Sequence, residues 1–211
     1  MQTLVFAPQM LINAWNIPRA PWLDHHALEE VRRLFRLRMA LVPYLYSAFY
    51  AYRTEGKAPV RALACDYTED RSTYEIADEY LLGDSLLVAP MTETEEARKV
   101  YLPEGVWYDF YSGKKYSGGT YEIETEEIPV FVKHNTVLPL AKPVAHISRE
   151  TVFEITLYCY GERGSCVLIE DDGETYDSEE TVVTVEFDGN TIRRGKYPKQ
   201  RYRMTGRRVI R

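Results

Sequence analysis

The sequence predicts an α+β fold in which a short segment of alternating strands and helices precedes a long series of strands. Up to residue 82, apolar runs alternate with helix-like stretches, and this βαβα order is typical of a parallel sheet or barrel. After Gly83, short strand-like runs follow one another closely, separated by Gly, Pro and Asn. That spacing is typical of antiparallel β-sandwiches.

The bulk properties are those of an ordinary globular chain of one or two domains. It has 211 residues, of which 45% are hydrophobic and 27% charged. The net charge of -6 argues against nucleic-acid binding, and no apolar run is long enough to cross a membrane. The first residues, MQTLVFAPQML, lack the charged region and cleavage site of a signal peptide. We therefore expect a cytoplasmic protein that binds neither nucleic acid nor membrane.

The chain opens with an apolar run at residues 3–8, which predicts a buried strand. A loop of polar and aromatic residues follows, in which Pro18 and Pro21 disfavour a helix.

A long helix is expected over residues 24–55, with Asp24 as its N-cap, acidic residues in its early turns and Gly56 as its C-cap. Pro43 is expected to kink or interrupt it. Its apolar residues recur every three or four positions and form one stripe: Leu28, Val31, Phe35, Met39, Val42, Tyr46 and Phe49. The arginines are expected to form a solvated face: Arg32, Arg33, Arg36 and Arg38.

Residues 58–66 predict a second short buried strand, and the stretch up to Gly83 predicts a short helix. The run SLLVAP is apolar throughout and predicts a strand covered on both sides. Further strands are expected in RKVYLP, VWYDFYSG, KYSGGTYEIE, IPVFVKHNTVLPL, VFEITLYCY, SCVLIED and TVVTVEFDG, with one or two more in the basic tail. A weak boundary falls at residues 141–148.

The cysteines and histidines indicate neither a disulfide framework nor a zinc site. Cys159 and Cys166 could face each other across a hairpin, but reduced, buried thiols are favoured for a chain with three cysteines, the third being Cys65. His25 and His26 are adjacent and point in different directions on a helix. No metal or cofactor is expected.

Six segments, in this order and spacing, resemble the C-terminal part of glycoside hydrolase family thirty-one, the α-glucosidases and α-xylosidases. They are LRMALVPYLYS (37–47), GKAPVRAL (56–63), DEYLLGDSLLVAPM (78–91), VYLPEGVWYDFYSG (100–113), IPVFVKHNTVLPL (128–140) and IEDDGETYD (169–177). The resemblance covers nearly the whole chain and is weakest after residue 178.

The resemblance implies three parts. Residues 1–82 would be the remnant of the last two βα units of a (β/α)8 barrel: strand seven at 3–10, its helix, strand eight at 58–66 and a last short helix at 72–82. Residues 83–145 and 146–211 would be proximal and distal antiparallel β-sandwich domains.

The resemblance also implies that the catalytic residues lie elsewhere. Retaining glycosidases use two carboxyl groups, and both family aspartates lie on earlier barrel strands. A fragment of this kind is expected to be inactive alone. Asp66, Asp70 and Asp84 are assigned structural or loop roles.

Substrate contacts are expected in the loop after strand seven. Where the family usually has Arg-x-His-Gly, this sequence has Leu11, Ile12, Asn13 and Ala14. Asn13 is expected to hydrogen-bond a sugar hydroxyl with its amide. Trp15 either stacks on the sugar or packs under the adjacent β-domain.

Two questions of chemistry stay open. The many tyrosines suit sheet faces, which is the commoner role, but also sugar-binding surfaces. The acidic run at 169–177 lacks calcium-loop spacing, and Asp172-Gly173 favours a hairpin turn.

The parent enzyme is therefore expected to hydrolyse α-glucosides or related sugars. The alternatives are a non-catalytic carbohydrate-binding or scaffolding module, and a fragment of a related α-transglycosylase. Expected partners are carbohydrate in the intact enzyme, the remainder of the catalytic barrel, and a second copy through the 24–55 helix.

Overall fold

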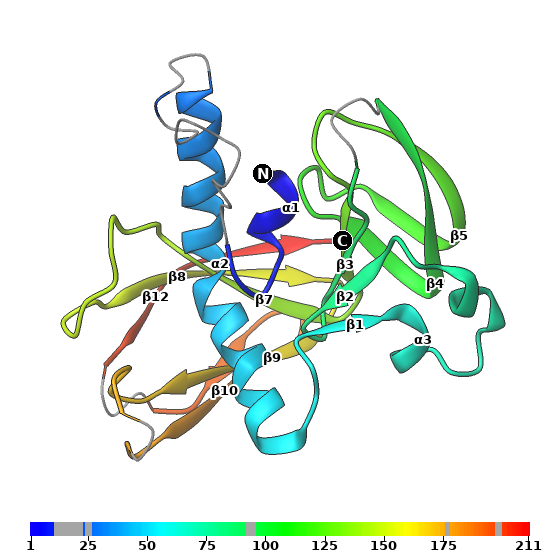
Figure 1. Ribbon diagram of the computed structural model, residues 1–211. Helices are drawn as coiled ribbons and strands as arrows, with labels where there is room; N and C mark the ends of the chain where they lie inside the picture. Colours follow the sequence, from blue (N-terminus) through cyan, green and yellow to red (C-terminus); the bar gives the residue numbers. More distant parts are fainter. Residues whose placement is uncertain (11–22, 24–26, 92–95, 176–177, 197–199) are drawn as a thin grey trace.

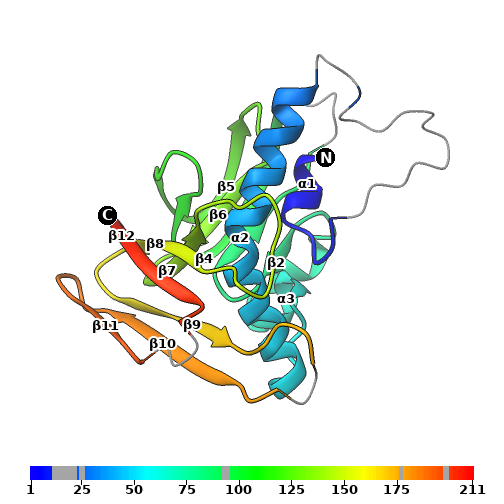
Figure 2. The ribbon, with the colours of Figure 1, turned by 90° about the vertical axis from the view of Figure 1, so that its left-hand side faces the viewer.

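The computed structural model describes residues 1–10, 23, 27–91, 96–175, 178–196 and 200–211. Within these residues, two six-stranded sheets and one long helix, α2 (Leu28–Glu55), make up most of the fold (Figure 1). The helix runs past both sheets, as the turned view shows (Figure 2). One core cluster joins side chains from the helix, from the first sheet and from the second, such as Leu41, Leu86 and Leu138. The α+β class, rich in strands, is confirmed.

The first residues form a short helix, α1 (Gln2–Val5), and the prediction of a strand at residues 3–8 is wrong. The backbone here makes local hydrogen bonds, from Leu4 N–H to the Met1 carbonyl at 3.0 Å and from Phe6 N–H to the Thr3 carbonyl at 3.1 Å. A single strand leaves its N–H and C=O groups without partners, whereas a helical turn satisfies them within the segment. The expected burial is nevertheless present, because Val5 and Phe6 are fully buried.

The long helix is confirmed, with differences at its ends and at its proline. It begins at Leu28 with Ala27 as N-cap, so the N-cap is not Asp24, which lies outside the described residues. Gly56 ends it in the left-handed conformation at φ 71°, which a glycine adopts without strain. Pro43 does not interrupt it. The lost N–H bond is tolerated because Pro43 and its neighbours Tyr44 and Leu45 are buried against the core.

The helix buries a different face from the predicted one. Its buried residues are Val31, Leu34, Leu41, Pro43, Tyr44 and Leu45. Of the predicted stripe only Val31 is buried, while Phe35, Tyr46 and Phe49 are about 40% exposed at 41%, 40% and 39%. The helix carries apolar residues on two sides. The regular spacing used for the prediction belongs to the more exposed side.

The first sheet runs in the order β1-β2-β3-β6-β4-β5, and all its pairs are antiparallel. Its elements are β1 (Val60–Ala62), β2 (Tyr80–Leu82), β3 (Leu86–Val88), β4 (Ala97–Asp109), β5 (Lys115–Glu124) and β6 (Val130–Lys133). Between β1 and β2 lie α3 (Leu63–Asp66) and the 3₁₀ helix η2 (Arg71–Glu75).

Two predictions for this stretch are corrected. The expected strand at 58–66 shrinks to β1, which pairs antiparallel with β2 instead of joining a parallel barrel. The expected helix at 72–82 is only η2, because the apolar Leu81 and Leu82 are buried on opposite faces of a strand. Gly83, at φ 58°, then turns the chain directly into β3.

The strand β3 is covered on both sides, as the apolar run predicts. Leu86 and Val88 belong to the core cluster beneath α2, whereas Leu87 and Ala89 belong to a second cluster on the other face. That second cluster exists because β4 bends at an irregularity between Leu102 and Val106, which brings its first half back over the sheet. One sheet thus rolls over itself, and side chains of β3, β4 and β6 pack face to face within it.

The Glu79 side chain connects the two layers of this rolled sheet. Its carboxylate accepts the Tyr101 N–H at 2.8 Å, which joins the start of β2 to the first half of β4, although the two strands are not neighbours in the sheet. Glu79 is only 6% exposed, and burial raises its pKa to about 7. Arg98 lies 3.8 Å away and favours the ionised form, whereas Asp78 opposes it.

The second sheet runs in the order β11-β10-β9-β7-β8-β12. Its strands are β7 (Thr136–Ala141), β8 (Phe153–Tyr160), β9 (Gly164–Glu170), β10 (Thr181–Phe187), β11 (Ile192–Arg194) and β12 (Tyr202–Ile210). The prediction of a purely antiparallel sheet is wrong, since β12 pairs with β8 in parallel and β7 contacts β9 in parallel. One or two strands were expected in the basic tail, and two are present, β11 and β12.

The two ends of this sheet also approach each other. The Arg207 guanidinium of β12 lies over the Phe187 ring of β10 at 5.9 Å and donates to the Asn190 carbonyl. A separate apolar cluster fills the enclosed face, with Val137, Leu157 and Val185 among its fully buried members. Each sheet therefore has a separate apolar cluster on one face. On its other face it contributes to the common core cluster that also contains residues of α2.

The three cysteines are free, as expected, although Cys65 is exposed. Cys159 and Cys166 do not face each other, because β7 lies between β8 and β9. The Asp172-Gly173 turn is confirmed: it follows β9, and Gly173 has φ 70°. Asp172 accepts the N–H groups of Glu174 and Thr175 at 2.9 Å each, which is the hydrogen bonding of an Asx turn.

Replacing Glu79 with Gln is expected to remove a pH-dependent destabilisation. The folded-state pKa of about 7 lies above the ordinary value near 4.5, so the unfolded chain loses this proton first. Wild-type stability should therefore fall relative to Glu79→Gln between pH 4.5 and 7, by roughly 3 kcal/mol, and differ little below that window. Urea unfolding at several pH values measures this. Glu122→Gln, an exposed carboxyl on β5, is the control, and equal pH profiles for wild type and Glu79→Gln would contradict the prediction.

Candidate functional site

The two residues predicted to contact substrate, Asn13 and Trp15, lie outside the described residues, as do His25 and His26. The expected sugar contact therefore stays a prediction. The chain before them is held by α1, by the residues that follow it up to Met10, and by the middle of α2.

Arg38 holds this part of the chain. Its guanidinium donates to the carbonyls of Val5 at 2.9 Å and Pro8 at 2.7 Å, and also to that of Ala7. Burial lowers the pKa of Arg38 from its usual value. The planar fork of five N–H donors suits three converging carbonyls, which a single ammonium group could not hold in the same way. The expectation that Arg38 belongs to a solvated face is therefore wrong.

Other contacts fix the same segment from the opposite side. The rings of Phe6 and Phe110 meet edge to face at 5.7 Å, and the Tyr80 hydroxyl donates to the Phe6 carbonyl at 3.2 Å. The Gln2 side chain pairs with the backbone near β6, donating to the Glu126 carbonyl at 3.0 Å and accepting the Ile128 N–H at 2.7 Å. The segment that precedes Asn13 and Trp15 in the chain is therefore tied to α2, β2 and the approach to β6.

The carboxylates assigned structural roles have them. Asp66 makes two 2.7 Å bonds with Arg61, and this pairing holds the pKa of Asp66 below its usual value. Asp84 lies 2.6 Å from the Lys57 ammonium. Asp70 caps η2 and accepts the Tyr101 hydroxyl at 2.6 Å. The three carboxylates therefore each hold neighbouring segments of the chain together.

Glu79 has the one strongly raised carboxyl pKa among the described residues, and such a group is a candidate general acid. Its burial beneath the rolled sheet argues against that role, because no described cavity is lined by it. A general acid must reach the substrate, so the role of Glu79 is structural: its hydrogen bond from Tyr101 connects β2 to β4.

Sequence reasoning missed the roles of Arg38 and Glu79. For Arg38 a signal was present: it stands four positions after Leu34 and three before Leu41, in phase with the buried face. For Glu79 none was present, since the contact depends on the bend in β4. The described residues contain no group of three or more His, Cys, Asp or Glu able to hold a metal, and none of their helices is long and apolar enough to cross a membrane.

The family model for the glycosyl hydrolase family 31 C-terminal domain matches residues 56–138. An α-xylosidase of Saccharolobus solfataricus is 33% identical over 185 residues, covering 84% of this chain and 25% of that protein. An isomaltosyltransferase of Sporosarcina globispora is 34% identical over 135 residues, covering 59% of this chain and 12% of that protein. The solved α-xylosidase of Xanthomonas citri matches 99% of this chain and 25% of its own, with a TM-score of 0.82 and 26% identity. The chain thus spans about a quarter of the curated α-xylosidase.

Replacing Arg38 with Ala is expected to release the base of the loop. Two carbonyl bonds of ordinary length and one shorter one are lost, so amide exchange in residues 2–8 should accelerate by at least tenfold, corresponding to about 1.4 kcal/mol or more. Hydrogen exchange with mass spectrometry measures this. Arg36→Ala, exposed on the same helix, should leave that segment unchanged. Similar exchange in both variants would show that Arg38 does not hold the segment.

Proposed function

The chain belongs to glycosyl hydrolase family 31, and on that premise we propose that it forms the C-terminal part of a retaining α-glycosidase acting on α-glucosides or related sugars. The observation that carries this proposal is the extent of agreement with the Xanthomonas α-xylosidase, which takes in 99% of the chain at a TM-score of 0.82. The order of six sequence segments supports it independently.

In this proposal the chain provides structure and substrate contacts, while the other part of the enzyme provides the two catalytic aspartates. Retention needs one carboxylate as nucleophile and one carboxyl as general acid/base. The involvement of Asp66, Asp70 and Asp84 in local contacts supports assigning neither role to them. The chain alone is then inactive.

We assign residues 1–82 to the end of the catalytic barrel, 83–145 to a proximal β-domain and 146–211 to a distal one. In this assignment residues 3–8 take the position of strand seven by sequence order, and they form the short helix α1 and the turns after it. The fixed base at Arg38 would then present the following loop at the carboxyl end of strand seven. There Asn13 would bond a sugar hydroxyl, and Trp15 would stack on the sugar or pack below it.

Two alternatives differ in chemistry. A transglycosylase parent is supported by the similarity to the isomaltosyltransferase, and differs in whether a sugar or water attacks the intermediate. A non-catalytic carbohydrate-binding or scaffolding role would be favoured if the rest of the protein were unrelated to the barrel. Free cysteines support a cytoplasmic location.

The outer face of α2 is proposed to contact the remainder of the barrel in the intact enzyme and a second copy when the chain is alone. It consists of Phe35, Met39, Val42, Tyr46 and Phe49. Three of these are large side chains about 40% exposed, at 41%, 40% and 39%. Because they follow one another at steps of four, three, four and three, they suit packing against another helix.

The purified 211-residue chain is expected to give no turnover of aryl α-glucosides or aryl α-xylosides, because both catalytic aspartates are assigned elsewhere. Release of the aryl group is followed by absorbance, with the full-length Saccharolobus α-xylosidase as positive control. Turnover by the chain above background would refute the assignment.

The chain alone is expected to sediment as a species larger than a monomer at micromolar concentration, because the outer face of α2 is apolar. Phe35→Glu combined with Phe49→Glu should shift it to monomer in analytical ultracentrifugation. Tyr74→Glu alters a residue that is 60% exposed on η2 and should have no effect. A monomeric wild type would contradict this use of the face.

A further inference from the structure

The charge of the chain is unevenly distributed. Residues 190–211 contain nine Lys or Arg and no Asp or Glu, whereas the whole chain has a net charge of -6. The other 189 residues hold 17 basic and 32 acidic residues, so their net charge is -15. A basic segment on an acidic protein creates a local positive field that attracts anions.

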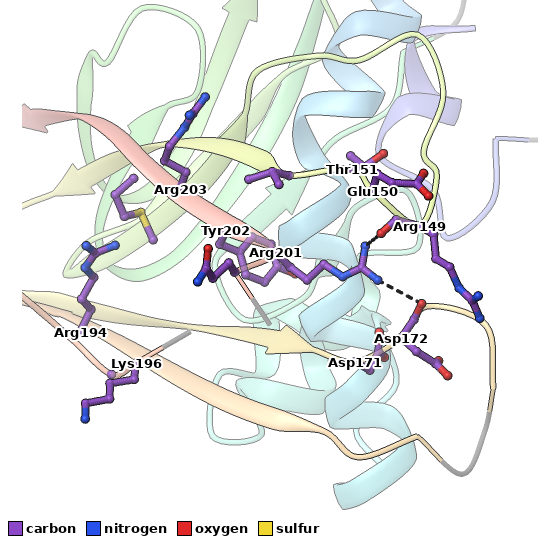
Figure 3. A pocket seen from close by; sticks show the side chains of 14 residues that line it. Arg149, Glu150, Thr151, Asp171, Asp172, Arg194, Lys196, Arg201, Tyr202 and Arg203 are labelled. Atoms are coloured by element: carbon purple, nitrogen blue, oxygen red, sulfur yellow. Dashed lines mark hydrogen bonds between the residues drawn. The ribbon is translucent and has the colours of Figure 1, made fainter. Parts of the chain in front are cut away.

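The structure gathers part of this segment around an open cleft of about 1290 Å³ at one end of the second sheet. Its walls come from four segments: residues 149–152 before β8, 171–172 after β9, 194–196 at the end of β11, and 200–204 around the start of β12. Arg194 and Lys196 lie on one side of the cleft, and Arg201 and Arg203 on the other (Figure 3).

Arg201 joins three segments of the cleft wall to one another. Its guanidinium donates to the Arg149 carbonyl and, at 3.4 Å, to the Asp172 carbonyl (Figure 3). Its backbone N–H donates to the Glu170 carboxylate at 2.6 Å. These hydrogen bonds connect the start of β12 to the end of β9 and to the segment before β8, and so hold the walls of the cleft together.

Three carboxylates also line the cleft, Glu150, Asp171 and Asp172, so its five cations leave a net charge of +2, and hydrogen bonds within their own segments hold these carboxylates. Asp172 accepts two backbone N–H groups and the Thr175 hydroxyl, and these bonds hold its pKa well below the usual value. Asp171 accepts the Gly173 N–H at 2.9 Å, and Glu150 accepts the Ser148 hydroxyl at 3.1 Å.

Two of the five lining cations pair with acids beyond the lining, Arg149 with Glu174 and Arg203 with Glu154. Among the described residues Lys196 makes no ion pair.

We propose that this cleft binds a polysaccharide segment bearing oxyanion groups, such as carboxylate, phosphate or sulfate. Guanidinium groups match the planar or forked oxygens of these anions, and Thr151 and Gln200 offer neutral polar groups for sugar hydroxyls. The volume exceeds the roughly 300–1,000 Å³ of small-molecule pockets, and the cations stand on both walls, which suits an extended ligand. Only the choice of a saccharide rests on the proposed function.

The test is titration calorimetry of the 211-residue chain with polygalacturonate, neutral dextran and polyglutamate in low salt. Binding to polygalacturonate is expected, weakening as salt is added, whereas dextran should not bind and polyglutamate should bind at least tenfold more weakly. Arg194→Gln combined with Lys196→Gln should weaken polygalacturonate binding by about tenfold or more. Lys114→Gln combined with Lys115→Gln, which removes the same charge from exposed positions in the first sheet, should change it less than about twofold.

Lys196→Arg keeps the charge and should keep the affinity, and melting temperatures verify that each variant is folded. Equal losses in the two double variants, or dextran binding as tightly as polygalacturonate, would overturn the anion site. Polyglutamate binding equal to polygalacturonate would overturn the saccharide. None of these outcomes depends on turnover, so the inference and the glycosidase proposal fail separately.

Discussion

The hydroxyl group of Tyr44 joins the long helix to the turn on which the first sheet depends. It donates to the Leu82 carbonyl at 2.6 Å and accepts the Ser85 N–H at 3.0 Å, so one buried group satisfies both ends of the β2–β3 turn. Burial raises the pKa of Tyr44, which keeps the hydroxyl protonated and able to donate. The intervening Gly83 has φ 58°, and a Cβ there would lie 2.4 Å from the Tyr44 hydroxyl oxygen. Only glycine satisfies both the backbone angle and the close approach.

The same turn also receives Arg61 from β1. Its guanidinium donates to the Gly83 carbonyl at 3.0 Å while pairing with Asp66 at 2.7 Å. Through these contacts β1, β2 and β3 are all positioned relative to α2. Since Arg38 of the same helix holds residues 5–8, the helix is the common reference for the first sheet and for the base of the candidate substrate loop.

The sequence predicts those elements whose cause is local, and misses those whose cause is distant. The regular spacing in α2, the Gly56 cap and the apolar run of β3 are properties of neighbouring residues, and all are present. The partner of a strand is not such a property, so the antiparallel pairing of β1 and the parallel pairing of β12 were missed. The buried side of α2 was misassigned because both of its sides are apolar. Of the candidate site, the contacts of Asn13 and Trp15 stay a prediction from family resemblance. The buried position of Arg38 follows from its spacing in α2, whereas its three carbonyl partners do not.

The parallel pairing of β12 with β8 has a consequence for the order in which the protein assembles. Tyr202 pairs with Phe153, 49 positions earlier in the chain, and the strands between them build the opposite edge of the sheet. During synthesis on the ribosome, the edge of β8 stays open until residues 202–210 have emerged. Contacts of such long sequence separation form slowly, and an open edge invites pairing with other chains. The basic side chains of β12 therefore emerge after every other strand of this sheet, at the edge that has stayed open until then.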